Sequence, residues 1–464
     1  MALHHPLLMA LAALAQGAIP ATAEVRLAPP VANPLADDMG SDPILALASG
    51  NVDEAEFVAL VRNAVDRYPG VDETAAGIAE AEAAEDEAKA GLYPTVDIGV
   101  NSNRTIAREF EGSALDNIIE RSRPAGRTDA TLSVQQTLFD FGATTARIAA
   151  AGARLRAASL RAEDAADQAA LRAIAAWYDV FTYRALVTLG TAFAENQQGL
   201  RGAVQVRIES GVSAPGDLPR VESYIASSQA DLARYRRQLA NAEARFEEMF
   251  GIPAPVGLGR APGTRVPSIS KEMAQLLARS TPEALSADAM ARAARQDARA
   301  QRAETLPRVT AGIDAGKYGV YEKDYDVRGR VTLNHRIFGG VDARADQARA
   351  RAASAAARAS RIRSESEREA AIAWSDVRAL EQQLAALENS YVASRQSRDV
   401  LAERFRVARG TLFDLLESES AYFNVAASYI RAITERDAAR YVLLSRTGQL
   451  LDRLDIDPPT LDDG

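Results

Sequence analysis

The sequence predicts a mixed α/β protein in which long helices alternate with β-hairpins. Two stretches near residues 95–139 and 308–338 alternate apolar and polar residues, as strands with one apolar face do. Each is followed by a run without proline, Ala143–Ser210 with 68 residues and Val341–Arg409 with 69. A continuous helix of that length would reach about 100 Å, so the helices are far longer than those of ordinary globular domains.

The two halves of the chain repeat one order of elements: helix, β-hairpin, very long helix, turn, helix. Phe139 and Phe338 lie 199 residues apart, and Gly211 and Gly410 are separated by the same distance. The spacing from hairpin to turn is therefore equal in both halves. A repeat of this size is too long for a solenoid unit, and we interpret it as two copies packed side by side.

The N-terminal residues read as a processing segment followed by an irregular one. Leu7–Leu14 are mostly apolar, and Ala21-Thr22-Ala23 fits a small-x-small cleavage site. We therefore predict a signal peptide over residues 1–23; a disordered tail is the alternative. Residues 24–50 are rich in proline and are predicted to be irregular.

The first repeat is predicted over residues 51–250. Its helices run to Tyr68 and, after a turn at Pro69–Gly70, to Ala90. Strands follow that present Val96, Ile98 and Val100 on one face, and then Leu132, Val134 and Leu138. The long helix ends near Gly211, and a last helix covers roughly 219–250.

The second repeat is predicted over residues 271–454, after a Pro/Gly-rich linker at 251–270. Its first helix stops at Pro307, and two alternating segments flank a tyrosine-rich turn. The long helix is interrupted near Gly410, and a last helix runs to about Leu454. Residues 455–464 are interpreted as a tail.

Composition excludes several classes of protein. The net charge of −9 offers no basic stripe for nucleic acid. Cysteine is absent, which removes disulfides and thiol nucleophiles, and of three histidines only His335 lies beyond the N-terminus. We predict neither a metal site nor a cofactor, and no enzymatic activity.

The predicted strands are long enough to cross a bilayer when tilted. Four strands cannot close a membrane barrel, and open strand edges are not tolerated in lipid. If the strands enter a membrane, several chains must share one barrel. Tyr318, Tyr321 and Tyr325 then fit an aromatic girdle, although ordinary turn tyrosines fit equally well. Polar residues on the opposite face would line a wet lumen, namely Asp97, Asn101, Asn334 and Arg336.

In both halves, a phenylalanine and a glycine lie where the predicted strand gives way to the long helix. Phe139 and Gly142 mark it in the first, Phe338 and Gly340 in the second. An aromatic ring can anchor at an interface while glycine lets the backbone bend. We interpret these residues as barrel-to-helix junctions. A soluble coiled-coil rod would explain the helices but not the two hairpins.

These features resemble the TolC family of outer-membrane efflux and secretion channels. The resemblance rests on "LFDFG" and "IFGG" before the long helices, and on "GVSAPGDLPRVES" and "GTLFDLLESESAYFN" at the turns. It covers roughly residues 50–455. It implies a homotrimer whose four strands per chain form a 12-stranded transmembrane β-barrel, continued by a coiled-coil barrel of long α-helices.

The resemblance also implies location and partners. The channel would lie in the lipid of the outer membrane of a Gram-negative bacterium and extend into the periplasm. It would act as a passive conduit with a periplasmic membrane-fusion adaptor and an inner-membrane transporter of the ABC, RND or MFS class. The alternative function is a periplasmic coiled-coil adaptor or scaffold without a channel.

The resemblance assigns roles to the two turns that interrupt the long helices. The turns would be adaptor-docking tips, containing Gly211, Ser213, Asp217, Gly410 and Thr411. Asp414 and Glu417 would form the pore constriction. Their spacing places both on one helix face, although acids in a first helical turn are also favoured by the helix dipole alone.

Overall fold

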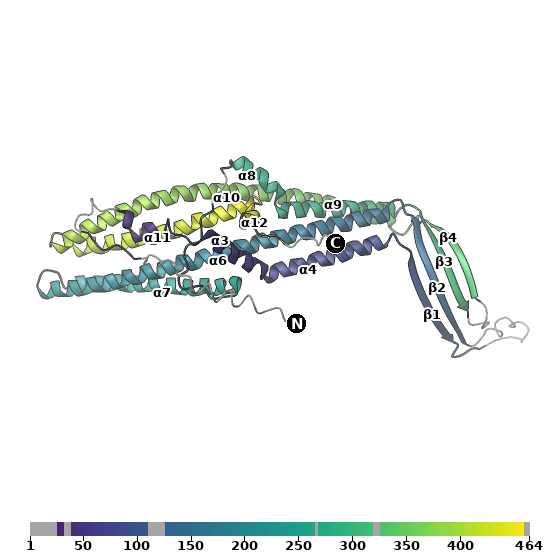
Figure 1. Ribbon diagram of the computed structural model, residues 1–464, viewed down its shortest axis with the longest axis horizontal. Helices are drawn as coiled ribbons and strands as arrows, with labels where there is room; N and C mark the ends of the chain where they lie inside the picture. Colours follow the sequence, from purple (N-terminus) through teal and green to yellow (C-terminus); the bar gives the residue numbers. More distant parts are fainter. Residues whose placement is uncertain (1–25, 32–38, 110–125, 265–267, 319–324, 459–464) are drawn as a thin grey trace, which may run out of the picture. The chain divides into compact units, whose positions relative to one another are not determined.

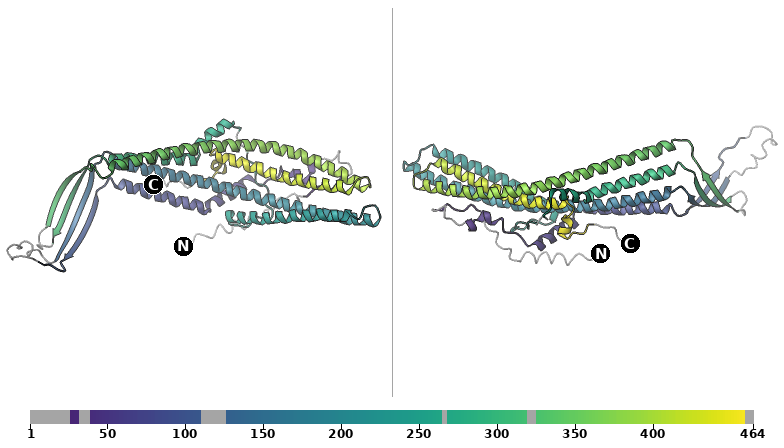
Figure 2. Two further views of the ribbon diagram at one scale, coloured as in Figure 1. Left: turned by 180° about the vertical axis from the view of Figure 1, so that it is seen from behind. Right: turned by 90° about the horizontal axis from the view of Figure 1, so that it is seen from above.

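The computed structural model describes residues 26–31, 39–109, 126–264, 268–318 and 325–458. The predicted signal peptide, Tyr321 and most of both hairpin loops lie outside these residues. The chain divides into two compact units. One holds residues 74–161 and 282–364, including all four strands; the other holds residues up to 73, 162–281 and 365–460. Figures 1 and 2 show the elements of each unit.

The first unit contains one antiparallel sheet in the order β1-β2-β3-β4. The strands are β1 (Thr95–Arg104), β2 (Gly126–Phe139), β3 (Arg308–Tyr318) and β4 (Tyr325–Asn334). Each strand pairs with the next in sequence, so β1 and β4 are the edges of the sheet (Figure 1).

The register gathers apolar side chains on one face of all four strands. Ile98 is opposite Leu132, Val134 opposite Ile313, and Ala315 opposite Val327. Ile98, Ile313 and Val327 are largely exposed in the single chain. The other face is polar: Ser133 donates to Asp314 at 2.9 Å, and Arg330 lies 3.4 Å from the same carboxylate. Such a sheet fits a barrel with lipid outside and water inside.

Four helices connect to the sheet in this unit. α4 (Pro69–Ala90) leads into β1, and α6 (Ala143–Glu209) follows β2. α9 (Pro282–Ala303) leads into β3, and α10 (Val341–Arg406) follows β4. Alanine lets these helices approach closely; Ser286 of α9, for example, donates to the carbonyl oxygen of Ala157 at 3.1 Å.

The second unit packs the rest of α6 and α10 with α7 (Asp217–Phe250), α11 (Leu412–Arg446), α3 (Glu54–Asp66) and α12 (Leu450–Leu454). Its largest core surrounds Trp177, whose indole meets Phe57 edge-on at 5.3 Å between ring centres. The indole nitrogen donates to the carbonyl oxygen of Gly259. Tyr441 donates to the carbonyl oxygen of Pro262 at 2.8 Å, so the 251–264 part of the predicted linker is fastened to the helices.

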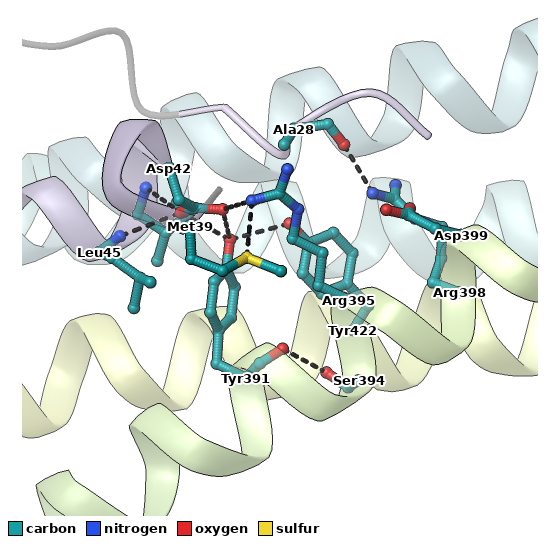
Figure 3. A network of polar contacts seen from close by, with 11 residues as sticks. Ala28, Met39, Asp42, Leu45, Tyr391, Ser394, Arg395, Arg398, Asp399 and Tyr422 are labelled. Carbon is teal, nitrogen blue, oxygen red and sulfur yellow. Dashed lines mark hydrogen bonds and ion pairs between the residues drawn. The ribbon is translucent and has the colours of Figure 1, made fainter. Parts of the chain in front are cut away.

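The N-terminal segment is fastened to α10 and α11 by a buried polar network (Figure 3). Asp42 accepts hydrogen bonds from Tyr391 and from Arg395, the latter at 2.7 Å. Tyr391 and Tyr422 share a 2.8 Å hydrogen bond. Arg398 donates to the carbonyl oxygen of Ala28 at 2.7 Å. Burial raises the pKa of Tyr422 to about 12, which keeps its hydroxyl protonated within the network.

Several predicted boundaries were wrong. Pro69 and Gly70 open α4 and do not form a turn, because proline suits the first turn of a helix. α10 ends at Arg406, not Arg409. The last helix breaks at residues 447–449, where Gly448 has a φ of 69°. β4 ends at Asn334, so Arg336 lies beyond the sheet.

Some short elements were not predicted at all. The segment 24–50, expected to be irregular, contains η1 (Met39–Ser41) and α2 (Pro43–Ala46), and Asp42 caps α2. α8 (Lys271–Leu277) and η2 (Ala278–Ser280) precede α9. None of the described helices is both long and apolar enough to cross a membrane.

Candidate functional site

The first tip turn links α6 to α7 through a glycine in the left-handed region. Gly211 has a φ of 72°, and the amide of Val212 donates to the carbonyl oxygen of Arg207 at 2.8 Å. Helices commonly end with a residue in the left-handed conformation, and glycine is favoured there because that conformation is strained for residues with a Cβ atom. Ser213 lies in the turn and is half-buried, and Asp217 opens α7.

The second tip turn links α10 to α11 by a different device. Ala408, and not Gly410, takes the left-handed conformation, with a φ of 60°. Gly410 is instead pressed against the end of α10, since a Cβ there would lie 3.1 Å from the Cβ atom of Arg404. Thr411 caps α11 by accepting from the amide of Asp414 at 3.1 Å. Gly211 is therefore required by its positive φ, whereas Gly410 is required by the close approach of Arg404.

The two tips pack against each other. Val204, Val221, Phe405, Leu412, Leu415 and Leu416 form one buried cluster with residues from all four helices. Arg207 of α6 joins the halves: its guanidinium lies 4.4 Å from the centre of the Phe405 ring and donates to the carbonyl oxygen of Phe405 at 3.2 Å. Sequence reasoning missed this contact, because no local pattern relates residues 198 positions apart.

Asp414 and Glu417 lie in the first turns of α11, and both are exposed. Within the described part of the chain, neither carboxylate has an ion-pair partner. Their neighbours Leu415 and Leu416 point into the tip cluster, so the two acids occupy the opposite, solvent-facing side of the helix. The arrangement leaves both charges available to ions or to another copy of the chain.

The first predicted barrel-to-helix junction, between β2 and α6, combines an aromatic pair with a capping carboxylate. The rings of Phe139 and Phe141 meet at 4.6 Å, and Phe141 and Gly142 both have positive φ. Asp140 accepts from the amide of Thr144 at 2.7 Å and from the amide of Gly142 at 3.0 Å. These hydrogen bonds satisfy amides at the start of α6 that have no partner within the helix.

At the second predicted junction, between β4 and α10, the described residues with positive φ are both glycines. Gly339 and Gly340 have φ values of 90° and 75°. Phe338 is 85% exposed, so its ring has no packing partner comparable to that of Phe139. The two junctions share the change of direction but not the capping chemistry.

Replacing Asp140 by alanine should lower the free energy of unfolding by about 1 kcal/mol, the usual effect of losing a helix N-cap. Denaturant titration in detergent measures it. Asp342 is a suitable control because it lies in the first turn of α10, and Asp342→Ala should have a smaller effect. Equal effects would show that the hydrogen bonds of Asp140 contribute little.

Comparison with known proteins places this architecture in a family. Residues 60–251 match the family model described as "Outer membrane efflux protein". The outer membrane efflux protein BepC of Brucella suis is 23% identical over 352 residues, which cover 72% of this chain and 76% of that protein. Over residues 60–251, the chain therefore matches the outer membrane efflux protein family.

Solved structures agree with the fold of this channel. A membrane protein from Pseudomonas aeruginosa superimposes with a TM-score of 0.76 at 21% identity, covering 91% of this chain and 96% of that one. The outer membrane protein VceC of Vibrio cholerae gives 0.74 at 17% identity, with coverages of 85% and 96%. The predicted fold, a helical barrel joined to a β-barrel shared by three chains, is confirmed.

The protein is therefore an outer-membrane channel for efflux or secretion that extends into the periplasm, and it is not an enzyme. Like its family, it forms trimers and works with adaptor and pump proteins. The open edges of β1 and β4 explain the trimer physically, because each must pair with a strand of another copy to be satisfied in lipid.

Proposed function

We propose that the two tip turns form the docking end of the channel. They would receive a periplasmic membrane-fusion adaptor that is coupled to an inner-membrane transporter of the ABC, RND or MFS class. The packing of the two tips into one cluster supports this proposal, because it brings Gly211, Ser213, Asp217, Gly410 and Thr411 to one end of the helical unit. Val206, Val212, Val407 and Phe413 expose apolar surface there, which suits a protein partner.

Crosslinking tests the docking end directly. The chain has no cysteine, so single cysteines at Ser213 and Thr411 introduce unique reactive groups. Both should crosslink to the adaptor when channel and adaptor are expressed together. Val96→Cys and Val309→Cys, on the strands, are the matched controls. Crosslinks from the strands with none from the tips would contradict the proposal.

We further propose that Asp414 and Glu417 form the pore constriction. Three copies would supply two rings of three carboxylates, and their exposure without ion-pair partners in the described chain supports this. Like charges crowded in a narrow mouth produce a negative potential that attracts cations. Such rings should favour cations over anions and bind multivalent cations.

Replacing both acids by alanine should reduce cation selectivity and block by multivalent cations by roughly tenfold, while conductance is kept or raised, because the rings also repel themselves. Planar-bilayer recordings measure all three quantities. Glu209→Ala with Glu222→Ala removes the same charge from the other tip and should have a smaller effect. Unchanged selectivity and block in the first variant would leave these carboxylates as an ordinary helix N-terminal turn.

We also propose the following division of the chain: a signal peptide at 1–23, an N-terminal segment at 24–50, repeats at 51–250 and 271–454 around a linker at 251–270, and a tail at 455–464. The similar order of elements in the two repeats supports it. Tyr325 is 80% exposed at the start of β4, which suits contact with outer-membrane lipid headgroups.

A further inference from the structure

The order of the strands determines which helices meet between copies of the chain. β1 and β4 are the free edges of the sheet, so closing the barrel pairs β4 of one copy with β1 of the next. α4 leads into β1 and α10 follows β4. The two helices beside each seam between copies are therefore α4 of one chain and α10 of its neighbour, running in opposite directions.

α4 carries a stripe of exposed acids on the side that faces away from its own chain. Glu80 and Glu87 are seven residues apart, which is about two helical turns, and both are exposed. Glu73 lies seven residues earlier on the same helix. The carboxylate of Glu85 points toward α6, where a Cβ on Gly152 would lie 3.2 Å from it. At about 100° per residue, Glu80 and Glu87 lie on roughly the opposite side of α4 from Glu85.

α10 carries a stripe of exposed arginines with the same spacing. Arg344, Arg351 and Arg358 are seven residues apart and exposed. Among the described residues these three have no ion-pair partner, whereas Arg349 pairs with Asp346 and Arg363 with Asp288. The helix faces its own chain with other residues, the buried alanines at 345, 348, 352 and 359.

Exposed alanines accompany both stripes. On α4 they are at 76, 79 and 83, and on α10 at 343, 350 and 357. Alanine allows two helices to approach closely along a seam. Charged residues beside such a seam occupy the positions that form ion pairs between the helices of a coiled coil.

The two stripes also lie at the same distance from the ends of their helices that adjoin the sheet. Glu87 lies three residues before the end of α4, and Arg344 lies three residues after the start of α10. Because the helices run in opposite directions with equal rise, Glu80 then comes level with Arg351, and Glu73 with Arg358. The segments have opposite charge as well: residues 74–90 contain five acids and one lysine, while residues 341–364 contain six arginines and two aspartates.

We propose that Glu80 and Glu87 of each copy pair with Arg351 and Arg344 of the next copy and set the register of the trimer. This rests on the trimer of the preceding sections and adds the residues that align its chains. Each exposed ion pair contributes little, about twofold in an equilibrium constant. Two pairs at each of three seams act together, and a shift of fewer than seven residues along the helices would move the two charges of every pair apart.

Charge reversal tests the pairing. The variant Glu80→Arg with Glu87→Arg should lower the equilibrium constant for trimer formation by tens of fold, since six pairs are reversed at about twofold or more each. Adding Arg344→Glu and Arg351→Glu should restore it. Analytical ultracentrifugation in detergent measures the trimer fraction.

A matched control restores the same net charge with substitutions at positions away from the seam. Adding Arg295→Glu and Arg299→Glu on α9 restores the same net charge without touching the seam, and it should not rescue the trimer. Rescue by both combinations would leave only a general charge effect, and rescue by neither would show that these side chains do not pair. Either result would overturn the proposal.

Crosslinking tests the register independently of stability. A chain carrying Glu87→Cys and Arg344→Cys should give covalent trimers with a short bismaleimide, because this sequence contains no other cysteine. Arg349→Cys in place of Arg344→Cys should give far less product. A native trimer that crosslinks equally from both positions would overturn this proposal alone, whereas a wild-type protein that is monomeric in detergent would overturn the trimer on which it rests.

Discussion

Replacing Arg398 by methionine should lower the free energy of unfolding by about 3–5 kcal/mol, the usual cost of removing one partner from a buried charged network. The side chain of Arg398 is 1% exposed and makes four kinds of contact. It donates to Asp399 at 2.6 Å and to the carbonyl oxygen of Ala28 at 2.7 Å, lies 3.7 Å from Glu419, and stacks 4.5 Å from the centre of the Tyr422 ring.

The expected loss of stability is large because two buried carboxylates would lose the charge of Arg398. Burial already raises the pKa of Glu419, against the opposing attraction of Arg398. Without the guanidinium, Glu419 would lose the attraction of Arg398, and Asp399 would keep the attraction of Arg395 but lose its hydrogen-bonded ion pair. The segment near Ala28 would also lose its hydrogen bond to α10 (Figure 3).

Denaturant titration in detergent measures the loss, and limited proteolysis should show earlier cleavage of the N-terminal segment. Arg406→Met on the same helix is the matched control, because Arg406 forms an exposed pair with Glu403. Its loss should change the free energy of unfolding by less than about 1 kcal/mol. Adding Asp399→Asn to Arg398→Met should recover part of the loss, since one uncompensated charge is then removed. Equal effects of the two arginine substitutions would contradict the account.

Stability should fall as the pH rises from about 4 to 7, by up to about 3 kcal/mol from Asp167 alone. Burial raises the pKa of Asp167 from 3.8 to about 6, with smaller contributions from the nearby Asp164 and Glu163. The hydrogen bond from Ser445 and the charge of Arg446 act in the opposite direction.

The sign follows from proton binding in the two states. Because the folded-state pKa is raised, the folded protein holds a proton between pH 4 and 6 that the unfolded chain has already released. Raising the pH across this window therefore favours unfolding, and the full penalty is reached above pH 6. Burial raises the pKa of Asp164 as well, which adds to the effect with the same sign.

Asp167→Asn isolates the contribution, because asparagine can still accept the hydrogen bond from Ser445 but does not titrate. The variant should equal the wild type in stability near pH 4 and exceed it near pH 7. Denaturation at several pH values measures the difference. Asp231→Asn on α7, where Asp231 forms an exposed pair with Arg234, is the control and should leave the pH profile unchanged. A constant gap between Asp167→Asn and the wild type at all pH values would contradict the assignment.

Local patterns in the sequence predicted the main elements well. Alternation of apolar and polar residues located all four strands, because a strand with one face in lipid repeats every two residues. The absence of proline over 68 and 69 residues indicated the two long helices, whose stability comes from an apolar stripe along their whole length. Boundaries were less accurate, since helix ends depend on capping, as at Pro69 and Gly448.

The sequence could suggest the tip residues but not their roles. Equal spacing from the hairpins placed Gly211 and Gly410 at corresponding turns, yet only Gly211 adopts positive φ. At the second tip Ala408 does so, and Gly410 is required by a close approach to Arg404. A backbone with positive φ and a tightly packed backbone both favour glycine. The sequence therefore cannot show which of the two reasons applies at a given position, whereas the structure does.

By itself, the sequence determined the strands, the long helices, the duplicated order and the absence of thiol chemistry, because these depend on residues close together in the chain. The tertiary structure alone decided which distant groups meet. Arg398 binds Ala28 across 370 positions, Arg207 meets Phe405 across 198, and Trp177 holds the linker at Gly259. A buried charge or indole N–H must find a hydrogen-bond partner in the folded protein. The periodicity of the sequence does not show which distant residue supplies that partner.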